Sequence, residues 1–152
     1  MHTKLGKIFR ASAAGLAMFA VTAFAANHHS LNGTWTLEAT RSEFGGQPSI
    51  QTGSVTINDR EHNITVTRSF TYDGANESFE YSFTTDGREN SSIRQGKTFK
   101  SKAKWEGDVL KVTTVENGGT TVEKYSLAPD GALMLVVDRP EHRPVTLYFK
   151  HQ

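Results

Sequence analysis

Several short runs of this chain alternate strictly between apolar and polar residues, and this pattern limits the possible folds. The clearest run, residues 98–105, places on one face Lys100, Lys102 and Lys104. Its opposite face carries Phe99, Ser101, Ala103 and Trp105. A period of two residues puts one face of a strand against a core and the other in water. No segment from Ser30 onward shows a helical period, so the pattern predicts an all-β fold.

Turn signals divide the chain into ten predicted strands. Glycine beside aspartate or asparagine supplies the positive φ angles of tight hairpins, and such groups occur at Asp73-Gly74, Asp86-Gly87, Gly107-Asp108, Asn117-Gly118-Gly119 and Asp130-Gly131. The predicted strands span residues 33–38, 52–58, 63–71, 77–84, 88–93, 97–105, 109–116, 120–127, 132–138 and 144–150. Because nearly every connection has hairpin length, we expect an antiparallel up-and-down meander.

Closure into a barrel is the simplest way for so many antiparallel strands to lose their edges. A two-sheet sandwich is the alternative, but sandwiches usually need long crossings, and the only long connection here is residues 39–51. We therefore expect a closed, ten-stranded β-barrel. Alternate turns share an end, so the mouth should be formed by residues 39–51, 72–76, 94–97, 117–119 and 139–143. We expect Trp35 to plug the opposite end, the floor.

The first 25 residues have the pattern of a secretory signal peptide. Lys4, Lys7 and Arg10 precede an uncharged apolar stretch of about 14 residues, shorter than the roughly 20 needed to span a bilayer. Ala25 ends a small-x-small cleavage site, and Ala26 is an alternative end. The predicted segments are a signal at 1–25, a leader at 26–32 and one barrel domain at 33–150. We expect bacterial export to the periplasm or beyond, with a membrane anchor as the alternative.

Composition narrows the possible functions. The chain has no cysteine, which excludes a disulfide scaffold, a thiolate zinc site and a thiol nucleophile. Its formal charge is +1, but three of its 17 basic residues lie in the predicted signal, which leaves 14 basic and 16 acidic residues and a net charge of −2. We therefore expect no nucleic-acid partner. After removal of the signal we expect a monomer that is not an integral membrane protein.

Three stretches resemble small secreted bacterial lipocalin-like proteins, most of which have no established function. Gly33-Thr34-Trp35 is similar to the Gly-x-Trp motif that opens lipocalins, and residues 105–110 and 125–131 are similar to hairpins of the bacterial proteins. Ten strands resemble the fatty-acid-binding barrel more than the eight-stranded lipocalin. Over residues 31–150, the resemblance implies a calycin-type barrel that holds a small apolar molecule. Fatty-acid-binding barrels have a helical lid after their first strand, but Thr40–Gln51 contains two glycines and a proline and gives little helix signal.

The inward faces of the predicted strands give a candidate ligand site. Arg68 shares a face with Ile64, Val66 and Phe70, so it should point into the barrel. A ligand carboxylate or phosphate can bind a buried guanidinium bidentately. The alternatives are an internal pair with Glu123 or a bulge that turns Arg68 outward. We expect the ligand to contact Arg68, Phe79, Tyr81, Phe83, Phe99, Ser101, Trp105 and Tyr125. A solid core built from the same aromatic side chains is the other possibility.

Asn27-His28-His29 forms a candidate metal site near the predicted mature N-terminus. A free amine, two backbone nitrogens and the imidazole of His28 or His29 can surround Cu(II) or Ni(II) in a square plane. The plainer interpretation is two adjacent histidines in a flexible leader.

Two charged clusters also have a functional interpretation beside a plainer one. The turn at residues 138–143 can steer an anionic ligand together with Arg41, Arg94 and Lys97. The lysines at 100, 102 and 104 can contact an acidic polymer or lipid head groups. Either cluster can instead be an ordinary solvated surface.

Sequence motifs of enzymes are missing. The chain contains no Gly-x-Ser-x-Gly elbow, no His-Glu-x-x-His and no glycine loop for phosphates or dinucleotides. Glu123 shares a face with Tyr125 and Leu127, where a desolvated carboxyl could transfer a proton. Our leading hypothesis is an exported barrel that binds a small apolar or amphipathic molecule, without a tightly held cofactor. The alternatives are a small barrel enzyme that uses Glu123 and an envelope interaction protein with a filled core.

Overall fold

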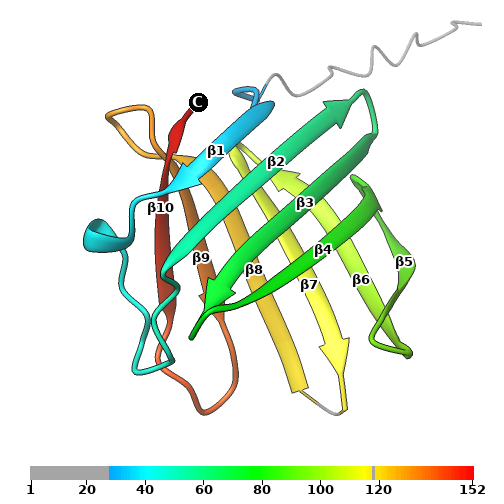
Figure 1. Cartoon of the computed structure of the whole chain (residues 1–152). Coiled ribbons are helices and arrows are strands. Elements are labelled where there is room, and N and C mark those ends of the chain that lie inside the picture. Colours follow the sequence, from blue (N-terminus) through cyan, green and yellow to red (C-terminus); the bar gives the residue numbers. More distant parts are fainter. Residues whose placement is uncertain (1–27, 118) are drawn as a thin grey trace, which may run out of the picture.

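The computed structural model describes residues 28–117 and 119–152, which form an antiparallel meander of ten strands (Figure 1). The strands are β1 (Gly33–Leu37), β2 (Thr52–Arg60), β3 (Asn63–Tyr72), β4 (Ala75–Thr84), β5 (Asp86–Arg94), β6 (Lys97–Glu106), β7 (Val109–Glu116), β8 (Gly119–Leu127), β9 (Leu133–Asp138) and β10 (Val145–His151). Each corresponds to a predicted strand, with boundaries that agree within two residues. The predicted signal peptide lies outside the described residues.

The strands form one sheet that curls into a nearly closed barrel. Each strand pairs with its sequence neighbour from β1 to β4 and from β5 to β10, and β1 also pairs with β10. The barrel prediction is confirmed except for one seam, because the described strands β4 and β5 share no backbone ladder. Side chains bridge the seam instead. The Asn90 side-chain oxygen accepts from Thr84 N at 3.2 Å, and Arg94 Nη1 donates to Tyr81 Oη at 3.0 Å.

The two ends of the barrel follow the alternation of turns. The connections after β1, β3, β5, β7 and β9 lie at the mouth, the lower end of Figure 1. The connections after β2, β4, β6 and β8 lie at the floor together with the C-terminus (Figure 1). The described part of the leader also reaches the floor, where His28 meets Asp59 at the end of β2.

The segment between β1 and β2 reaches the mouth without forming an α-helix, as its glycines and proline predict. Its one helical piece among the described residues is a 3-10 turn, Ala39–Arg41. Glu43 then pairs with Thr146 on β10 through backbone hydrogen bonds of 2.7 and 2.8 Å. Gly45 has a φ of 59°, and a Cβ there would lie 2.7 Å from the carbonyl oxygens of Arg143 and Pro144. Glycine thus permits the close approach that fastens this segment to the β9–β10 connection.

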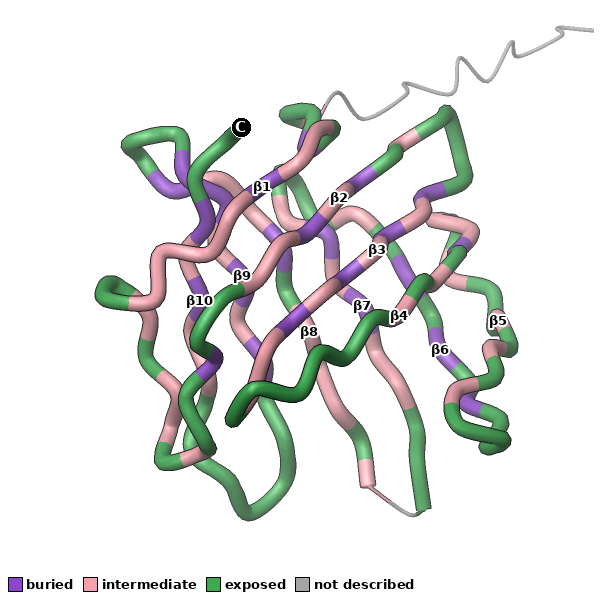
Figure 2. The backbone as a smooth tube through the Cα atoms, in the orientation of Figure 1, coloured by how far each residue is buried: buried purple, intermediate pink, exposed green. Residues whose placement is uncertain are grey.

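The predicted alternation reappears as a pattern of burial. On β3, the buried side chains are Ile64, Val66, Arg68 and Phe70. On β6, Phe99, Ser101 and Ala103 are buried while the lysines between them are exposed, and purple and green alternate along this strand in Figure 2. The sequence period therefore correctly assigned the inward face of both strands.

The floor half of the barrel is a solid apolar core. Trp35 is 4% exposed and donates its indole N–H to the Leu31 carbonyl at 3.0 Å. Its ring meets the His151 ring edge-on, with 4.8 Å between ring centres. Both neighbours lie at the floor, where Trp35 was expected. Fully buried side chains surround this end, including Val55, Ile57, Ile64, Val66, Leu110, Val112, Leu133, Leu135 and Phe149.

Candidate ligand-binding cavity

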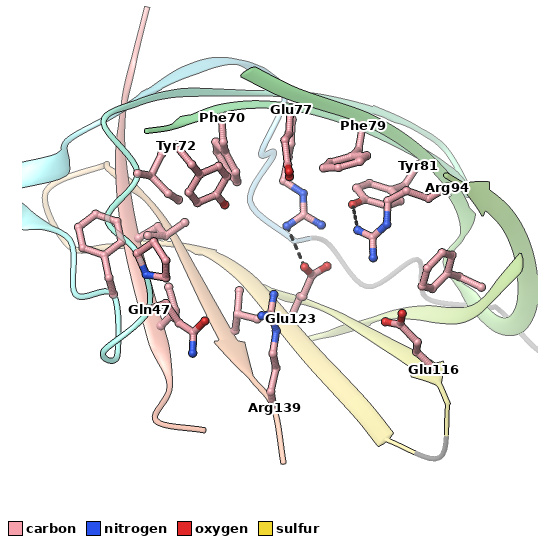
Figure 3. A pocket seen from close by; sticks show the side chains of 18 of the residues that line it. Gln47, Phe70, Tyr72, Glu77, Phe79, Tyr81, Arg94, Glu116, Glu123 and Arg139 are labelled. Carbon is pink, nitrogen blue, oxygen red and sulfur yellow. Dashed lines mark hydrogen bonds and ion pairs between the residues drawn. The ribbon is translucent and has the colours of Figure 1, made fainter. Parts of the chain in front are cut away.

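A cavity of about 390 Å³ occupies the mouth half of the barrel (Figure 3). Its aromatic wall consists of Phe44, Phe70, Tyr72, Phe79, Tyr81 and Phe99. Its charged lining consists of Arg68, Glu77, Arg94, Lys97, Glu116, Glu123 and Arg139. Ligand sites typically combine an apolar wall with a few polar groups in about 300–1,000 Å³. The cavity has that size and that combination, with one more basic than acidic side chain.

An ion pair crosses this cavity from β3 to β8. Arg68 Nη1 donates to Glu123 Oε1 at 2.8 Å, and the two side chains are 10% and 13% exposed. Glu123 points into the cavity (Figure 3). Arg68 therefore points inward as predicted, and it makes the internal pair that the sequence left as an alternative. One polar atom of the pair has no partner among the described residues, because Arg68 Nε is buried without a hydrogen bond.

The Arg68 guanidinium is a fixed positive charge with neutral phenols nearby. Burial lowers the pKa of Arg68, but the nearby Glu123, Tyr125 and Tyr81 outweigh burial, so the net pKa lies above its ordinary value. Burial raises the pKa of Tyr125, although the positive charge of Arg68 opposes the shift. Burial and the neighbouring Glu77 raise the pKa of Tyr72. The guanidinium thus stays charged at neutral pH, while the phenols of Tyr72 and Tyr125 stay protonated.

Arg94 connects the cavity wall across the seam. Its guanidinium lies 5.0 Å from the ring centre of Phe79 and 4.5 Å from that of Phe99. Its Nη1 also donates to the Tyr81 hydroxyl, whose ring lies 4.8 Å from the Arg68 guanidinium (Figure 3 labels Arg94 and Tyr81). Cations are attracted to the faces of aromatic rings. The aromatic wall therefore holds both guanidiniums in place as well as providing apolar surface.

Two further hollows adjoin the main cavity. A groove of about 410 Å³ follows the seam. Residues 76–81 of β4 form one side of it, and residues 92–95, at the end of β5, form the other. A hollow of about 290 Å³ extends toward Phe83 and Ser101 and shares Arg68 and Glu123 with the main cavity. The three hollows share Tyr81 and Arg94, so they adjoin one another at the seam.

Comparison of the fold with solved structures gives matches, whereas no family model and no curated protein sequence matches the chain. The chain is similar to the "REP1-NXSQ fatty acid transporter", with a TM-score of 0.64 and 18% identity over 80% of this chain and 96% of the other. Fatty-acid-binding protein 1 of Echinococcus granulosus gives a TM-score of 0.62 and 18% identity over 79% and 96% of the two chains. Secretory abundant heat soluble protein 4 from Ramazzottius varieornatus gives a TM-score of 0.62 and 16% identity, over 80% of this chain and 94% of the other.

The fold is that of the fatty-acid-binding-protein-like calycin barrels. At these identities the likeness concerns the fold alone. The calycin resemblance noticed in the sequence is thereby supported at the level of architecture. Within the described residues, no helix has the length and apolar character needed to cross a membrane.

Most of the predicted ligand contacts line the hollows of this barrel. Arg68, Phe79, Tyr81 and Phe99 line the main cavity, and Phe83 and Ser101 line the adjoining hollow. Trp105 and Tyr125 are not part of either lining. Trp105 lies near the floor and stacks on His28, and Tyr125 is 1% exposed within the core. Alternation predicts which side of a strand faces inward, but not how far along the barrel a residue lies.

The leader histidines contact the floor. The His28 ring stacks on Trp105 with 3.6 Å between ring centres, and its Nε2 lies 2.8 Å from Asp59 Oδ2. His29 Nδ1 lies 3.0 Å from Asp108 Oδ2. The amine and the preceding backbone nitrogens of the predicted copper or nickel site lie outside the described residues. Within residues 28–117 and 119–152, no three His, Cys, Asp or Glu side chains are grouped to hold a metal.

The predicted basic cluster at the mouth divides into two parts. Arg94, Lys97 and Arg139 line the cavity. Arg41 does not, because its Nη1 pairs with Asp130 Oδ2 at 2.7 Å and its guanidinium covers the ring of Tyr148.

Several polar residues of the lining were not predicted from the sequence, among them Gln47, Glu77 and Glu116. Two of them had a readable signal. Glu77 shares the alternating face of Phe79, and Glu116 shares that of Val112 and Thr114, so extending each run by one step identifies them. Gln47 lies in the irregular segment between β1 and β2, where no period exists to be read.

Proposed function

We propose that this barrel binds a small amphipathic molecule with an acidic head group inside its mouth half. The observation that carries the proposal is the buried Arg68 guanidinium, charged and facing a cavity of about 390 Å³ with an aromatic wall. Glu123 pairs with one nitrogen of this guanidinium, but the buried Nε has no hydrogen-bond partner among the described residues, so donor capacity remains for an acidic group. A ligand with an acidic head and an apolar body uses both parts of the lining.

The head group is assigned to Arg68, with Arg139 and Arg94 nearby in the lining. A guanidinium has five N–H donors, and Glu123 accepts from one nitrogen of Arg68. A carboxylate or phosphate offers further acceptors in a geometry that matches the guanidinium fork. The apolar body is assigned to the wall formed by Phe70, Phe79 and Phe99, with Phe44 and Ile50 covering it from the β1–β2 segment.

Displacement of a bound fluorescent probe tests this assignment. We would measure a long-chain fatty acid and the alcohol of the same chain length against the unchanged protein, Arg68→Met and the control Arg60→Met, which changes an exposed arginine at the end of β2. Loss of a charge-assisted hydrogen bond, about 1.5–3 kcal/mol, should weaken acid binding about ten- to a hundredfold in Arg68→Met. Binding of the alcohol, and both ligands in Arg60→Met, should change little.

Two results would contradict the proposal. Equal weakening of acid and alcohol in Arg68→Met removes the head-group role of Arg68. Failure of both ligands to displace the probe from the unchanged protein removes the binding function. Because Arg68→Met leaves Glu123 without its partner, the double variant Arg68→Met/Glu123→Leu serves as a second form without a lone buried charge.

Export belongs to the same proposal. The basic start, the apolar stretch and the Ala-x-Ala end support a cleaved signal, and the absence of cysteine suits a domain that folds without disulfides. We propose a monomer in the bacterial periplasm or beyond. The intact mass of the protein purified from periplasmic extract should correspond to a chain that begins at Ala26 or Asn27. A full-length mass in the membrane fraction would favour the anchor instead.

The geometry does not favour the enzyme alternative. That hypothesis needs Glu123 as an isolated carboxyl in apolar surroundings, whereas the structure places it 2.8 Å from a guanidinium nitrogen. The filled-core alternative describes the floor half of the barrel, and the cavity in the mouth half contradicts it there.

A further inference from the structure

Five lysines gather on the outer surface of β6, β7 and β8, where neither the cavity nor the core uses them. Lys100, Lys102 and Lys104 alternate with the buried residues of β6. The register then places Lys104 opposite Lys111 of β7, and Lys111 opposite Lys124 of β8. Three lysines thus form a row across three neighbouring strands. We call the surface defined by these five residues the lysine face.

The lysine face has more positive charge than its own carboxylates compensate. Glu89 lies 3.0 Å from Lys100, and Glu106 lies 3.0 Å from Lys104 and 3.5 Å from Lys111. Among the described residues, Lys102 and Lys124 form no ion pair. Like charges directly opposite one another destabilise a sheet. The register also places Asp86 opposite Lys104 and Glu89 opposite Lys102, so three carboxylates face five lysines. The excess positive charge attracts an anionic partner.

Two exposed apolar side chains lie on the same surface, near the mouth. Ile93 is 78% exposed and Val115 is 54% exposed, and they are the large hydrophobic residues most exposed in the described part of the chain. Ile93 lies opposite Thr98 on one side of β6, and Val115 lies opposite Lys100 on the other. Both alternate with inward residues, so both point outward with the lysines.

The combination favours a lipid surface over a soluble polyanion. Lysine stems can lie along apolar surface while their amines reach phosphate groups, and exposed aliphatic side chains gain free energy when they enter the acyl boundary. A nucleic acid or an acidic polysaccharide has no apolar layer that these aliphatic side chains could enter. Binding of single-stranded nucleic acid also uses exposed aromatic rings, and the large exposed hydrophobics here are aliphatic.

We propose that the lysine face, with Ile93 and Val115 at its mouth end, docks on the surface of an anionic lipid bilayer. Docking in this orientation brings the seam groove close to the lipid, because Ile93 lines that groove beside Arg94. An amphipathic ligand could then pass between bilayer and cavity without crossing bulk water. This last consequence rests on the proposed function, whereas the docking itself does not.

Flotation of the protein with lipid vesicles tests docking without any cavity ligand. Vesicles of equal parts phosphatidylglycerol and phosphatidylcholine should bind the protein at low salt, and vesicles of phosphatidylcholine alone should not. Lys102→Gln/Lys124→Gln breaks no ion pair of the described structure and should weaken binding about thirtyfold. Ile93→Ser/Val115→Ser should weaken it about tenfold. The matched control Arg60→Gln/Lys150→Gln removes two exposed charges from β2 and β10 and should have little effect.

Three outcomes would overturn the proposal: no preference of the unchanged protein for anionic vesicles, equal weakening in the control variant, or full binding by Ile93→Ser/Val115→Ser. The last would show that the lysines alone hold the protein on the vesicle and that the two aliphatic side chains do not enter the bilayer. Probe displacement in the absence of vesicles should stay unchanged in Lys102→Gln/Lys124→Gln, whose side chains line none of the three hollows. A loss of displacement with intact flotation counts against the proposed cavity function only, and the reverse counts against docking only. Circular dichroism melting confirms that each variant is folded.

Discussion

The floor half and the mouth half of this barrel are built by the same strands but filled in opposite ways. At the floor, the inward positions of β2, β7 and β9 hold Val55, Ile57, Leu110, Leu133 and Leu135, each at most 1% exposed. At the mouth, the inward positions hold arginines and glutamates beside aromatic rings, around an open cavity. A close-packed apolar interior stabilises the fold, whereas a hollow lined with charges stabilises it little. The difference indicates that stability and binding are separated along the barrel axis.

Alanine substitutions of two phenylalanines test this separation most strongly. Phe149 is fully buried in the floor core, and Phe79 is half-buried in the cavity wall. Phe149→Ala should lower the free energy of unfolding by about 3–5 kcal/mol. Phe79→Ala should lower it by about 1 kcal/mol or less but should weaken ligand binding. Urea denaturation measures the first effect and probe displacement the second. Equal losses of stability in the two variants would contradict the separation of roles.

The ion pair between the two halves should give the next largest effect. Glu123→Leu leaves the buried Arg68 guanidinium without its carboxylate, which should lower the free energy of unfolding by about 3 kcal/mol. The double variant Arg68→Met/Glu123→Leu should recover most of the loss, because no lone charge remains. Urea denaturation of both variants and of Arg68→Met completes a double-mutant cycle. An unaltered stability in Glu123→Leu would mean that the cavity solvates Arg68 by itself.

Much of the fold was readable from the sequence because its information is local. Alternation and turn residues identified ten strands, their inward faces and the two ends of the barrel. The open seam was not predicted. It depends on where β4 and β5 diverge, and there the Asn90 side chain takes over from the backbone ladder. A choice between backbone and side-chain partners is made in three dimensions, so a sequence period does not contain it.

The sequence predicted which side chains of the candidate site point inward, but not how far along the barrel axis each of them lies. Arg68 was placed inward because its neighbours on β3 are apolar, and its partner Glu123 followed from the same argument on β8. Trp105 and Tyr125 satisfy the same alternation, yet they lie toward the floor or within the core. Depth depends on strand tilt and on which residues fill the floor, and both are collective properties of the packed barrel.

Tyr125 gives a test of the floor core by pH. Its folded-state pKa is raised above the ordinary 10.0 by burial, so the unfolded chain releases this proton first as the pH rises. The contribution to stability is complete below pH 10.0 and then falls by about 1.4 kcal/mol per pH unit. Tyr125→Phe lacks that loss. Urea denaturation at about pH 8 and about pH 11 measures the stability of both proteins. Between these two pH values, the unchanged protein should lose more stability than Tyr125→Phe. A constant difference would show that the phenol is hydrated.

Substitution of Arg94 should have the smallest effect on stability. Its effect on the rates of ligand binding and release tests whether ligand leaves along the seam. The residue bridges β5 to Tyr81 of β4 and covers the ring of Phe99. Arg94→Gln removes one hydrogen bond and the ring contacts at a partly exposed site, so the free energy of unfolding should fall by about 1 kcal/mol or less. Ligand dissociation should become several-fold faster, because the side-chain bridge across the groove is lost. The control Arg88→Gln changes an 85% exposed arginine of the same strand. If Arg94→Gln weakens affinity through slower association instead, Arg94 attracts the head group and the seam is not the route by which ligand leaves.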